Sequence, residues 1–109
     1  MKRILLVVLL TSFLQDKPVE QFWTGRISDS MCGASHEMKV KGGNMSERDC
    51  IFECIKALAK YVLVDEKQQV IAIANQDLGG LPLYAGRMVK ITGELRNGAI
   101  LATKVEAAK

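Results

Sequence analysis

The chain has 109 residues, of which 49% are apolar, 25% charged and 6% aromatic. These proportions fit one globular domain and exclude a disordered or collagen-like chain. Fifteen basic and 12 acidic side chains give a net charge of +3, and the one histidine and three cysteines are too few for an elaborate catalytic centre.

The first 15 residues have the pattern of a secretory signal peptide. Lys2 and Arg3 precede an apolar run from Ile4 to Leu10, which is too short to span a bilayer. We therefore expect residues 1–15 to direct export to the periplasm or the medium, with membrane contact only before cleavage. The alternative is a buried N-terminal strand or helix. Without this segment the net charge falls to +1, which is weaker than a nucleic-acid binder normally carries.

A polar leader over residues 16–21 is expected to precede one domain over residues 22–106. Residues 22–28 alternate in the way typical of a strand, and Gly25 within them indicates a bulge or a sharp coil. Residues 29–45 lack periodicity, so we expect a long loop there.

A helix is predicted from Ser46 to about residue 60, with Asp49 in the position of a capping-box acid. Its apolar residues fall in one arc of a helical wheel, so this arc is expected to be buried. The arc contains Cys50, Ile51, Cys54, Ile55, Ala57 and Leu58.

The remainder of the chain has the residue pattern typical of β-strands. Strands are predicted over 61–64, 70–74, 88–95 and 99–105, with a short helix or ordered loop over 75–86. Asn97-Gly98 is a strong hairpin signal because both residues tolerate positive φ. On the strand over 88–95, one face is expected to consist of Val89, Ile91, Gly93 and Leu95.

This order predicts a mainly β fold, a five-stranded OB-like barrel. The helix at about 46–60 would be an insertion between the first and second strands.

The reactive residues are concentrated in one part of the chain. All three cysteines and the histidine lie between Cys32 and Cys54. Cys50 and Cys54 are one helical turn apart on one face, too far apart for an easy disulfide but well spaced for a shared metal ion. If the loop folds over the helix, Cys32 and His36 complete a Cys₃His tetrahedron. Methionine is abundant here as well, and Met31 and Met38 are possible further ligands, which favours copper(I) beside zinc.

Two other interpretations of these cysteines stay open. Export to an oxidising compartment favours a disulfide of Cys32 with Cys50 or Cys54, which would leave the third cysteine free. Alternatively, Cys50 and Cys54 are small core residues and His36 is solvated. With a disulfide and no metal, the domain would be a stapled module that binds a protein or small ligand in the cell envelope.

Enzymatic interpretations are weaker. The spacing of Cys50 and Cys54 is one residue too long for a thioredoxin-like motif. A Cys–His nucleophile pair needs a third group that orients the base; Asp29 is near Cys32 and His36 in the sequence, but such local clusters rarely form a triad. We therefore expect a non-enzymatic protein without a nucleic-acid partner, and thiol redox activity is a minor alternative.

The chain resembles a group of small exported bacterial proteins of unknown function that look OB-like. The resemblance rests on Asp29-x-x-Cys32-Gly-x-x-His36, on Cys50-x₃-Cys54 and on the segments 60–64 and 85–95. It covers residues 23–105, and it implies the fold and export but no particular mechanism.

Overall fold

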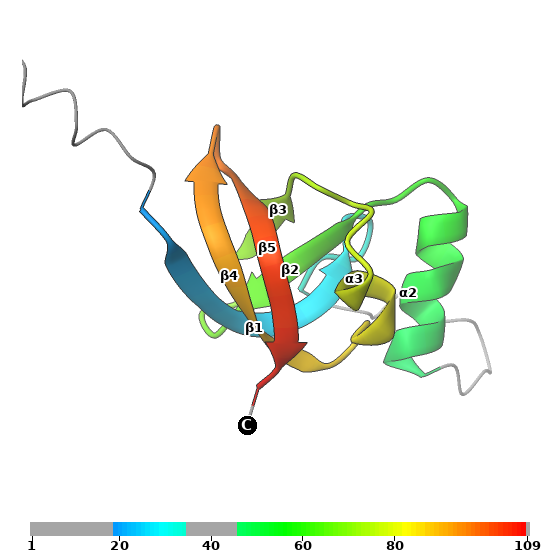
Figure 1. The fold of residues 1–109 in the computed structure, drawn as a ribbon. Helices are drawn as coiled ribbons and strands as arrows, with labels where there is room; N and C mark the ends of the chain where they lie inside the picture. Colours follow the sequence, from blue (N-terminus) through cyan, green and yellow to red (C-terminus); the bar gives the residue numbers. More distant parts are fainter. Residues whose placement is uncertain (1–18, 35–45, 109) are drawn as a thin grey trace, which may run out of the picture.

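The fold is seen in a computed structural model, which describes residues 19–34 and 46–108. Figure 1 shows a curved, closed sheet with the longer helix beside it. The predicted signal peptide over 1–15 and most of the predicted leader lie outside the described residues. So does the segment 35–45, which contains His36 and Met38.

Five strands and two short helices make up the described part of the chain. The strands agree with the predicted ones to within one or two residues at each end. The elements are β1 (Gln21–Asp29), α2 (Glu47–Lys56), β2 (Tyr61–Asp65), β3 (Val70–Ile73), α3 (Gly80–Leu83), β4 (Met88–Arg96) and β5 (Ala99–Ala107). The fold is therefore mainly β, as predicted, and α2 follows β1 and precedes β2 along the chain.

The sheet closes on itself in the order β1-β2-β3-β5-β4. Closure is possible because β1 is long enough to pair with two neighbours, β4 along its first part and β2 along its second. The two ladders meet at Gly25, which is opposite Asp65 on β2 and Val89 on β4. A Cβ atom on Gly25 would collide with the carbonyl of Val64, so only glycine permits this close approach. The prediction of a sharp coil at Gly25 agrees with this geometry.

The core fills the inside of the closed sheet and extends beneath both helices. Alternate residues of the strands point inward, and α2 adds Ile51 while α3 adds Leu81. The buried cluster consists of Ile27, Ile51, Tyr61, Leu63, Ile73, Leu81, Ala85, Val89, Ile91, Ile100 and Ala102.

The β4–β5 hairpin turns at Asn97-Gly98, as predicted, and both residues have positive φ, 51° and 81°. The predicted inward face of β4 is only partly correct. Val89 and Ile91 are fully buried, but Leu95 is 52% exposed. Leu95 lies near the tip of the hairpin, which projects beyond the rest of the sheet in Figure 1, and its partner on β5 is the fully buried Ile100.

The helix α2 begins as predicted, because the side chain of Ser46 accepts a hydrogen bond from the backbone N–H of Asp49. It ends at Lys56 rather than near residue 60. Leu58 has φ of 78°, and the N–H groups of Leu58 and Ala59 donate to the carbonyls of Ile55 and Cys54. This is a Schellman ending. The prediction that Ala57 and Leu58 belong to the buried arc is therefore wrong, since both follow the last helical turn and are exposed.

Candidate metal site

The site begins where β1 ends. Asp29, the last residue of β1, is completely buried, and its Oδ1 accepts hydrogen bonds from the backbone N–H groups of Met31 and Cys32, both at 2.9 Å. The carbonyl of Asp29 also accepts a bond from the N–H of Gly33 at 2.8 Å. These bonds fold residues 30–34 into a tight turn, whose backbone donors would otherwise lack partners. The turn fixes the position of the Cys32 backbone.

The other two cysteines are carried by α2. Cys50 and Cys54 are four residues apart and lie on the same face of the helix. Cys50 is only 6% exposed, whereas Cys54, in the last turn, is partly accessible, as is Cys32. The prediction that both helical cysteines lie on the inner side of the helix is confirmed.

The three sulfur atoms converge. The Sγ atoms of Cys32, Cys50 and Cys54 all lie within 4.8 Å of one another. The Sγ atoms of Cys32 and Cys54 are 3.9 Å apart, and all three cysteines are free thiols in this structure. Three thiols at this separation are close enough to hold one metal ion, because Zn–S bonds of about 2.3 Å in a tetrahedron place the sulfurs about 3.8 Å apart.

The surroundings of the thiols favour the neutral form when no cation is present. Burial raises the pKa of Cys54 to about 12, and the hydrogen bond with Cys32 and the neighbouring Asp29 carboxylate add to this effect. Burial also raises the pKa of Cys50, again assisted by Cys32 and by Asp29. A reactive cysteine normally has a lowered pKa in electropositive surroundings, which is the reverse of this arrangement. Cys50 and Cys54 therefore stay mainly protonated near neutral pH unless a cation favours their thiolate form.

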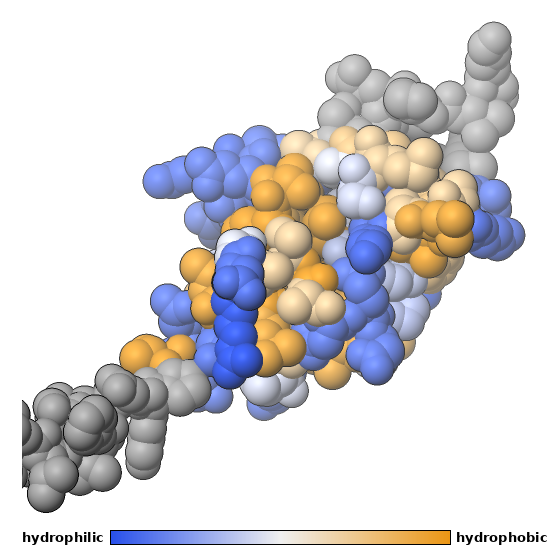
Figure 2. All heavy atoms as spheres, turned by 90° about the horizontal axis from the view of Figure 1, so that it is seen from above, coloured by the Kyte–Doolittle hydropathy of each residue, from blue (hydrophilic) through white to orange (hydrophobic). Residues whose placement is uncertain are grey.

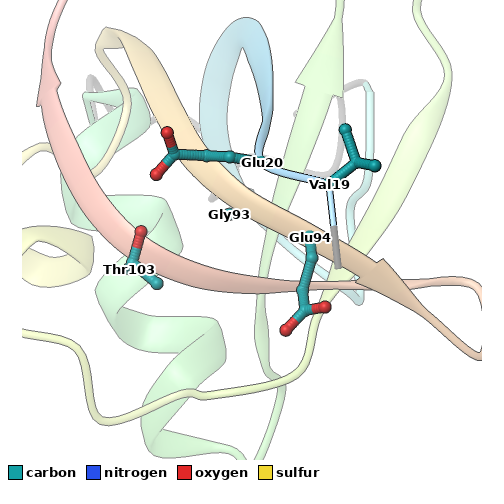
Figure 3. Close-up of a pocket in the computed structure, with 5 residues that line it drawn as sticks. All are labelled: Val19, Glu20, Gly93, Glu94 and Thr103. Atoms are coloured by element: carbon teal, nitrogen blue, oxygen red, sulfur yellow. The ribbon is translucent and has the colours of Figure 1, made fainter. Parts of the chain in front are cut away.

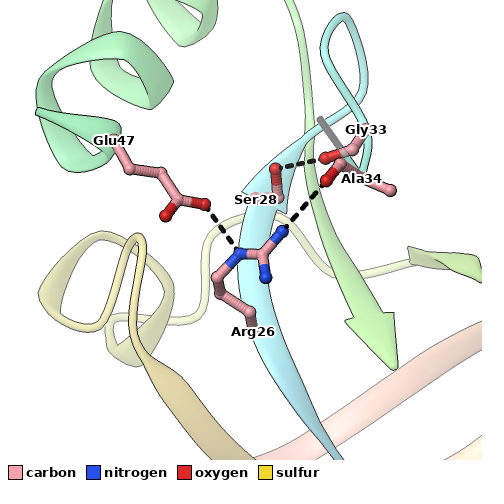
Figure 4. Close-up of polar contacts among 5 residues, drawn as sticks. All are labelled: Arg26, Ser28, Gly33, Ala34 and Glu47. Carbon is pink, nitrogen blue, oxygen red and sulfur yellow. Dashed lines mark hydrogen bonds and ion pairs between the residues drawn. The ribbon is translucent and has the colours of Figure 1, made fainter. Parts of the chain in front are cut away.

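Arg26 joins the two elements that carry the cysteines (Figure 4). Its Nε lies 2.6 Å from a carboxylate oxygen of Glu47 in the first turn of α2, and its Nη2 donates to the carbonyl of Ala34 at 3.3 Å. On the same strand, Ser28 donates its hydroxyl to the carbonyl of Gly33 at 2.7 Å. One side chain of β1 therefore contacts both the Cys32 turn and the start of the Cys50 helix.

A second connection closes the far end of the site. Ser30, at the start of the turn, donates its N–H to the carbonyl of Lys60 at 2.8 Å, and its Oγ accepts the N–H of Lys60 at 2.9 Å. Lys60 directly precedes β2, so the chain that leaves α2 is tied to the Cys32 turn. Between Ser30 and Lys60 the cysteine-bearing segment forms one closed loop.

The structure brings together three of the four predicted ligands. His36 and the possible ligand Met38 lie outside the described residues. Met31 lies next to Cys32, but its side chain is 61% exposed. The sequence patterns assigned no role to Arg26, and they singled out Asp29 only as a neighbour of Cys32 and His36. Asp29 belongs to the Asp-x-x-Cys element, and such an element at a strand end is a recognisable turn signal; nothing in the local sequence indicates the contacts of Arg26.

A small pocket away from the cysteines offers less chemistry. It encloses about 160 Å³ and is lined by Val19, Glu20, Gly93, Glu94 and Thr103. Figure 3 shows its two carboxylates pointing in different directions, and Glu94 is paired with Arg96 at 3.1 Å. The pocket therefore lacks a point on which polar groups converge.

The outer surface mixes apolar and hydrophilic side chains, as the face in Figure 2 illustrates. Exposed apolar side chains such as Phe22, Leu58 and Leu83 come from separate elements. Among the described residues, no helix is long and apolar enough to cross a membrane.

Comparisons of the chain with models of known protein families, with curated proteins and with solved structures gave no match. The functional argument therefore depends on the geometry of the cysteine site.

Proposed function

We propose that this protein is an exported, non-enzymatic, OB-like domain that binds copper(I) or zinc through Cys32, Cys50 and Cys54, with His36 as the fourth ligand. The observation that supports the proposal is the convergence of the three Sγ atoms to within 4.8 Å of one another. Thiolate ligands of this kind select copper(I) and zinc over harder cations such as magnesium and calcium.

The charge balance supports a cation at this place. Three thiols and the buried carboxylate of Asp29 lie close together, and a metal ion that replaces the thiol protons neutralises much of the resulting negative charge. The two thiols of α2 resist ionisation without such an ion. A bound cation would offset the negative charge that otherwise disfavours their thiolate form.

The choice between copper(I) and zinc depends on the fourth ligand. An imidazole from His36 would complete the tetrahedral Cys₃His set that structural zinc sites use, whereas thiolates alone or with a thioether from Met31 or Met38 suit copper(I). His36 follows Cys32 by only four residues, so the chain between them is long enough to return to the same ion.

The strand order also supports the OB-like part of the proposal. Five strands closed as β1-β2-β3-β5-β4, with a short helix between β3 and β4, are the arrangement expected of that barrel. The cysteine site then belongs to an insertion in the connection between β1 and β2. Such barrels commonly bind ligands with this connection, and export follows from the pattern of residues 1–15.

Metal titration of the purified, reduced protein tests the proposal. We expect one equivalent of Zn²⁺ or Cu⁺ to bind in competition with a chromophoric chelator. Serine in place of Cys32, Cys50 or Cys54 should weaken binding on the order of 100-fold or more, since loss of outer-shell groups alone typically costs 10–100-fold. His36→Ala should weaken zinc binding more than copper(I) binding. Lys67→Ala, at an exposed position between β2 and β3, is a control outside the ligand set. A reduced protein that binds neither ion refutes the proposal.

A disulfide-stapled binding module is the second candidate, and the 3.9 Å between the sulfurs of Cys32 and Cys54 favours it. In that case the partner is a protein or small ligand of the cell envelope. Serine substitution of this pair would then lower thermal stability, while chelators would change nothing. The isolated protein would have a mass two daltons below that of the fully reduced chain.

A further inference from the structure

The three thiols of the site are not equivalent toward oxidation. Cys32 and Cys54 are partly accessible, and their Sγ atoms are 3.9 Å apart. Cys50 is 6% exposed and lies beneath them. A small oxidant that reaches the site therefore meets Cys32 and Cys54 before it meets Cys50.

The backbone geometry excludes the pair of Cys50 and Cys54, and the short distance of 3.9 Å between the sulfurs favours the pair of Cys32 and Cys54. Cys50 and Cys54 share one helix face with roughly parallel Cα–Cβ vectors, and this arrangement opposes a disulfide within the turn. Cys32 approaches Cys54 from a different element, the turn after β1. The two sulfurs must close by about 1.9 Å to reach a bond length of about 2.0 Å. Side-chain rotation supplies much of such a displacement. Cys32 lies in the turn after β1, next to Gly33, and Cys54 lies in the last turn of α2.

We infer that Cys32 and Cys54 form a reversible disulfide that competes with the metal, so that oxidation by a low-molecular-weight disulfide releases the ion. This inference rests on the proposed metal-binding function and adds its regulation. The same sulfur atoms cannot be thiolate ligands and disulfide partners at once. Oxidation leaves only Cys50 and His36 of the four proposed ligands, and two ligands hold zinc or copper(I) far more weakly than four.

The oxidation of Cys32 and Cys54 is a thiol–disulfide exchange in which the oxidant is RSSR, a small disulfide such as oxidised glutathione. The sulfur of Cys32 attacks one sulfur of RSSR, which breaks the S–S bond and releases RS⁻. The sulfur of Cys54 then attacks Cys32 in the mixed disulfide and releases the second RS⁻. The Cys32–Cys54 pair loses two electrons, RSSR gains them, and the two thiol protons of the metal-free protein end on the two RSH products. In the metal-bound protein, solvent supplies these protons.

Oxidation of the intact chain tests the inference. The reduced protein is loaded with one equivalent of Zn²⁺ and incubated in glutathione buffers of increasing oxidised fraction. Free zinc is followed with a chromophoric indicator. Mass spectrometry after alkylation and proteolysis identifies the remaining thiol. We expect zinc release to parallel a loss of two daltons, Cys50 to be the alkylated residue, and added dithiol reductant to restore binding.

The variants separate this inference from the proposed function. Cys50→Ser should still form the disulfide, whereas Cys32→Ser and Cys54→Ser should not form it. A protein that binds zinc but pairs Cys32 with Cys50, or keeps three thiols in oxidised glutathione, overturns the redox inference and leaves the metal site intact. A protein that forms the disulfide but binds no metal when reduced overturns the proposed function and, with it, the exchange. Mass spectrometry of the oxidised wild-type protein identifies the disulfide without any variant, so misfolding of a serine variant does not obscure the result.

Discussion

Alanine in place of Asp29 should loosen the turn that carries Cys32. In the native protein the buried carboxylate accepts two backbone hydrogen bonds of 2.9 Å, from Met31 and from Cys32. Alanine leaves both donors without this acceptor in a region that water reaches poorly. Asparagine keeps an oxygen in the place of Oδ1, while it removes the charge and replaces the second carboxylate oxygen with an amide NH₂, so Asp29→Asn is the matched control for the two backbone hydrogen bonds.

The magnitude follows from the two lost bonds. Hydrogen bonds to a charged group contribute about 1.5–3 kcal/mol each, and relief of the buried charge offsets part of the loss. We therefore expect Asp29→Ala to lower the free energy of unfolding by about 2–4 kcal/mol, and Tm by on the order of 10–20 °C for a domain of this size. Asp29→Asn should lose no more than about 1 kcal/mol.

Metal affinity should change in parallel. If the turn of Asp29→Ala must be ordered during binding, fixing the backbone of Met31 and Cys32 costs about 1–2 kcal/mol per residue. The zinc affinity of Asp29→Ala should then fall on the order of 10-fold to several hundred-fold. Thermal unfolding by circular dichroism and zinc titration against a competing chelator measure the two effects. Equal Tm values for the alanine and asparagine variants would refute this role of the Asp29 carboxylate.

Three further outcomes are expected. Gly25→Ala places a Cβ against a backbone carbonyl of β2 and should lower the free energy of unfolding in urea by about 3 kcal/mol. In the control Gly79→Ala the new Cβ meets nothing within 4 Å, so the loss should be less than about 1 kcal/mol. Similar losses in the two variants would contradict the close approach at Gly25. Arg26→Met should weaken zinc binding several-fold in a competition titration, because it frees the turn from the helix. The control Lys104→Met removes only an exposed ion pair and should leave zinc affinity unchanged. An equal loss of zinc affinity in both variants would contradict the bridging role of Arg26. Burial raises the pKa of Cys54 to about 12 from an ordinary 9.0. The contribution of the neutral thiol to the stability of the metal-free protein is therefore present below pH 9 and is lost as pH rises from 9 to 12. In urea unfolding, Cys54→Ser should show a shallower decline of the unfolding free energy over this range, and an unchanged slope would contradict the assignment.

Elements specified by local pattern could be predicted from the sequence. Ser46 begins the helix because its hydroxyl accepts a bond from the N–H of Asp49, and that pairing is visible as a three-residue spacing. Asn97-Gly98 turns the hairpin because both residues adopt positive φ, which these residue types tolerate. The shared face of Cys50 and Cys54 follows from helical geometry alone.

The end of the helix could not be predicted in this way. A left-handed residue after a helix is usually glycine, but here it is Leu58, with φ of 78°. No residue type marks the stop, so the apolar pattern continues past it and gives a helix that is too long. The exposed Leu95 has a related cause, because periodicity indicates the face of a strand but not where the core beneath it ends.

The approach of Cys32 to the helix depends on contacts that no local pattern records. Ser30 and Lys60 are 30 positions apart, and their paired hydrogen bonds close the loop that contains all three cysteines. The early Schellman ending at Leu58 turns the chain toward this contact, and the two contacts of Arg26 join the turn to the start of α2. These bonds involve no cysteine side chain. The approach of the three sulfur atoms is therefore supported by contacts that need no metal ion, and these contacts lower the entropy cost of loop closure when an ion binds. A zinc finger, by contrast, folds only when its metal binds. We infer that removal of the metal from this protein leaves the barrel folded, and that its affinity for the ion is set by the backbone contacts around the thiols as well as by the thiols themselves.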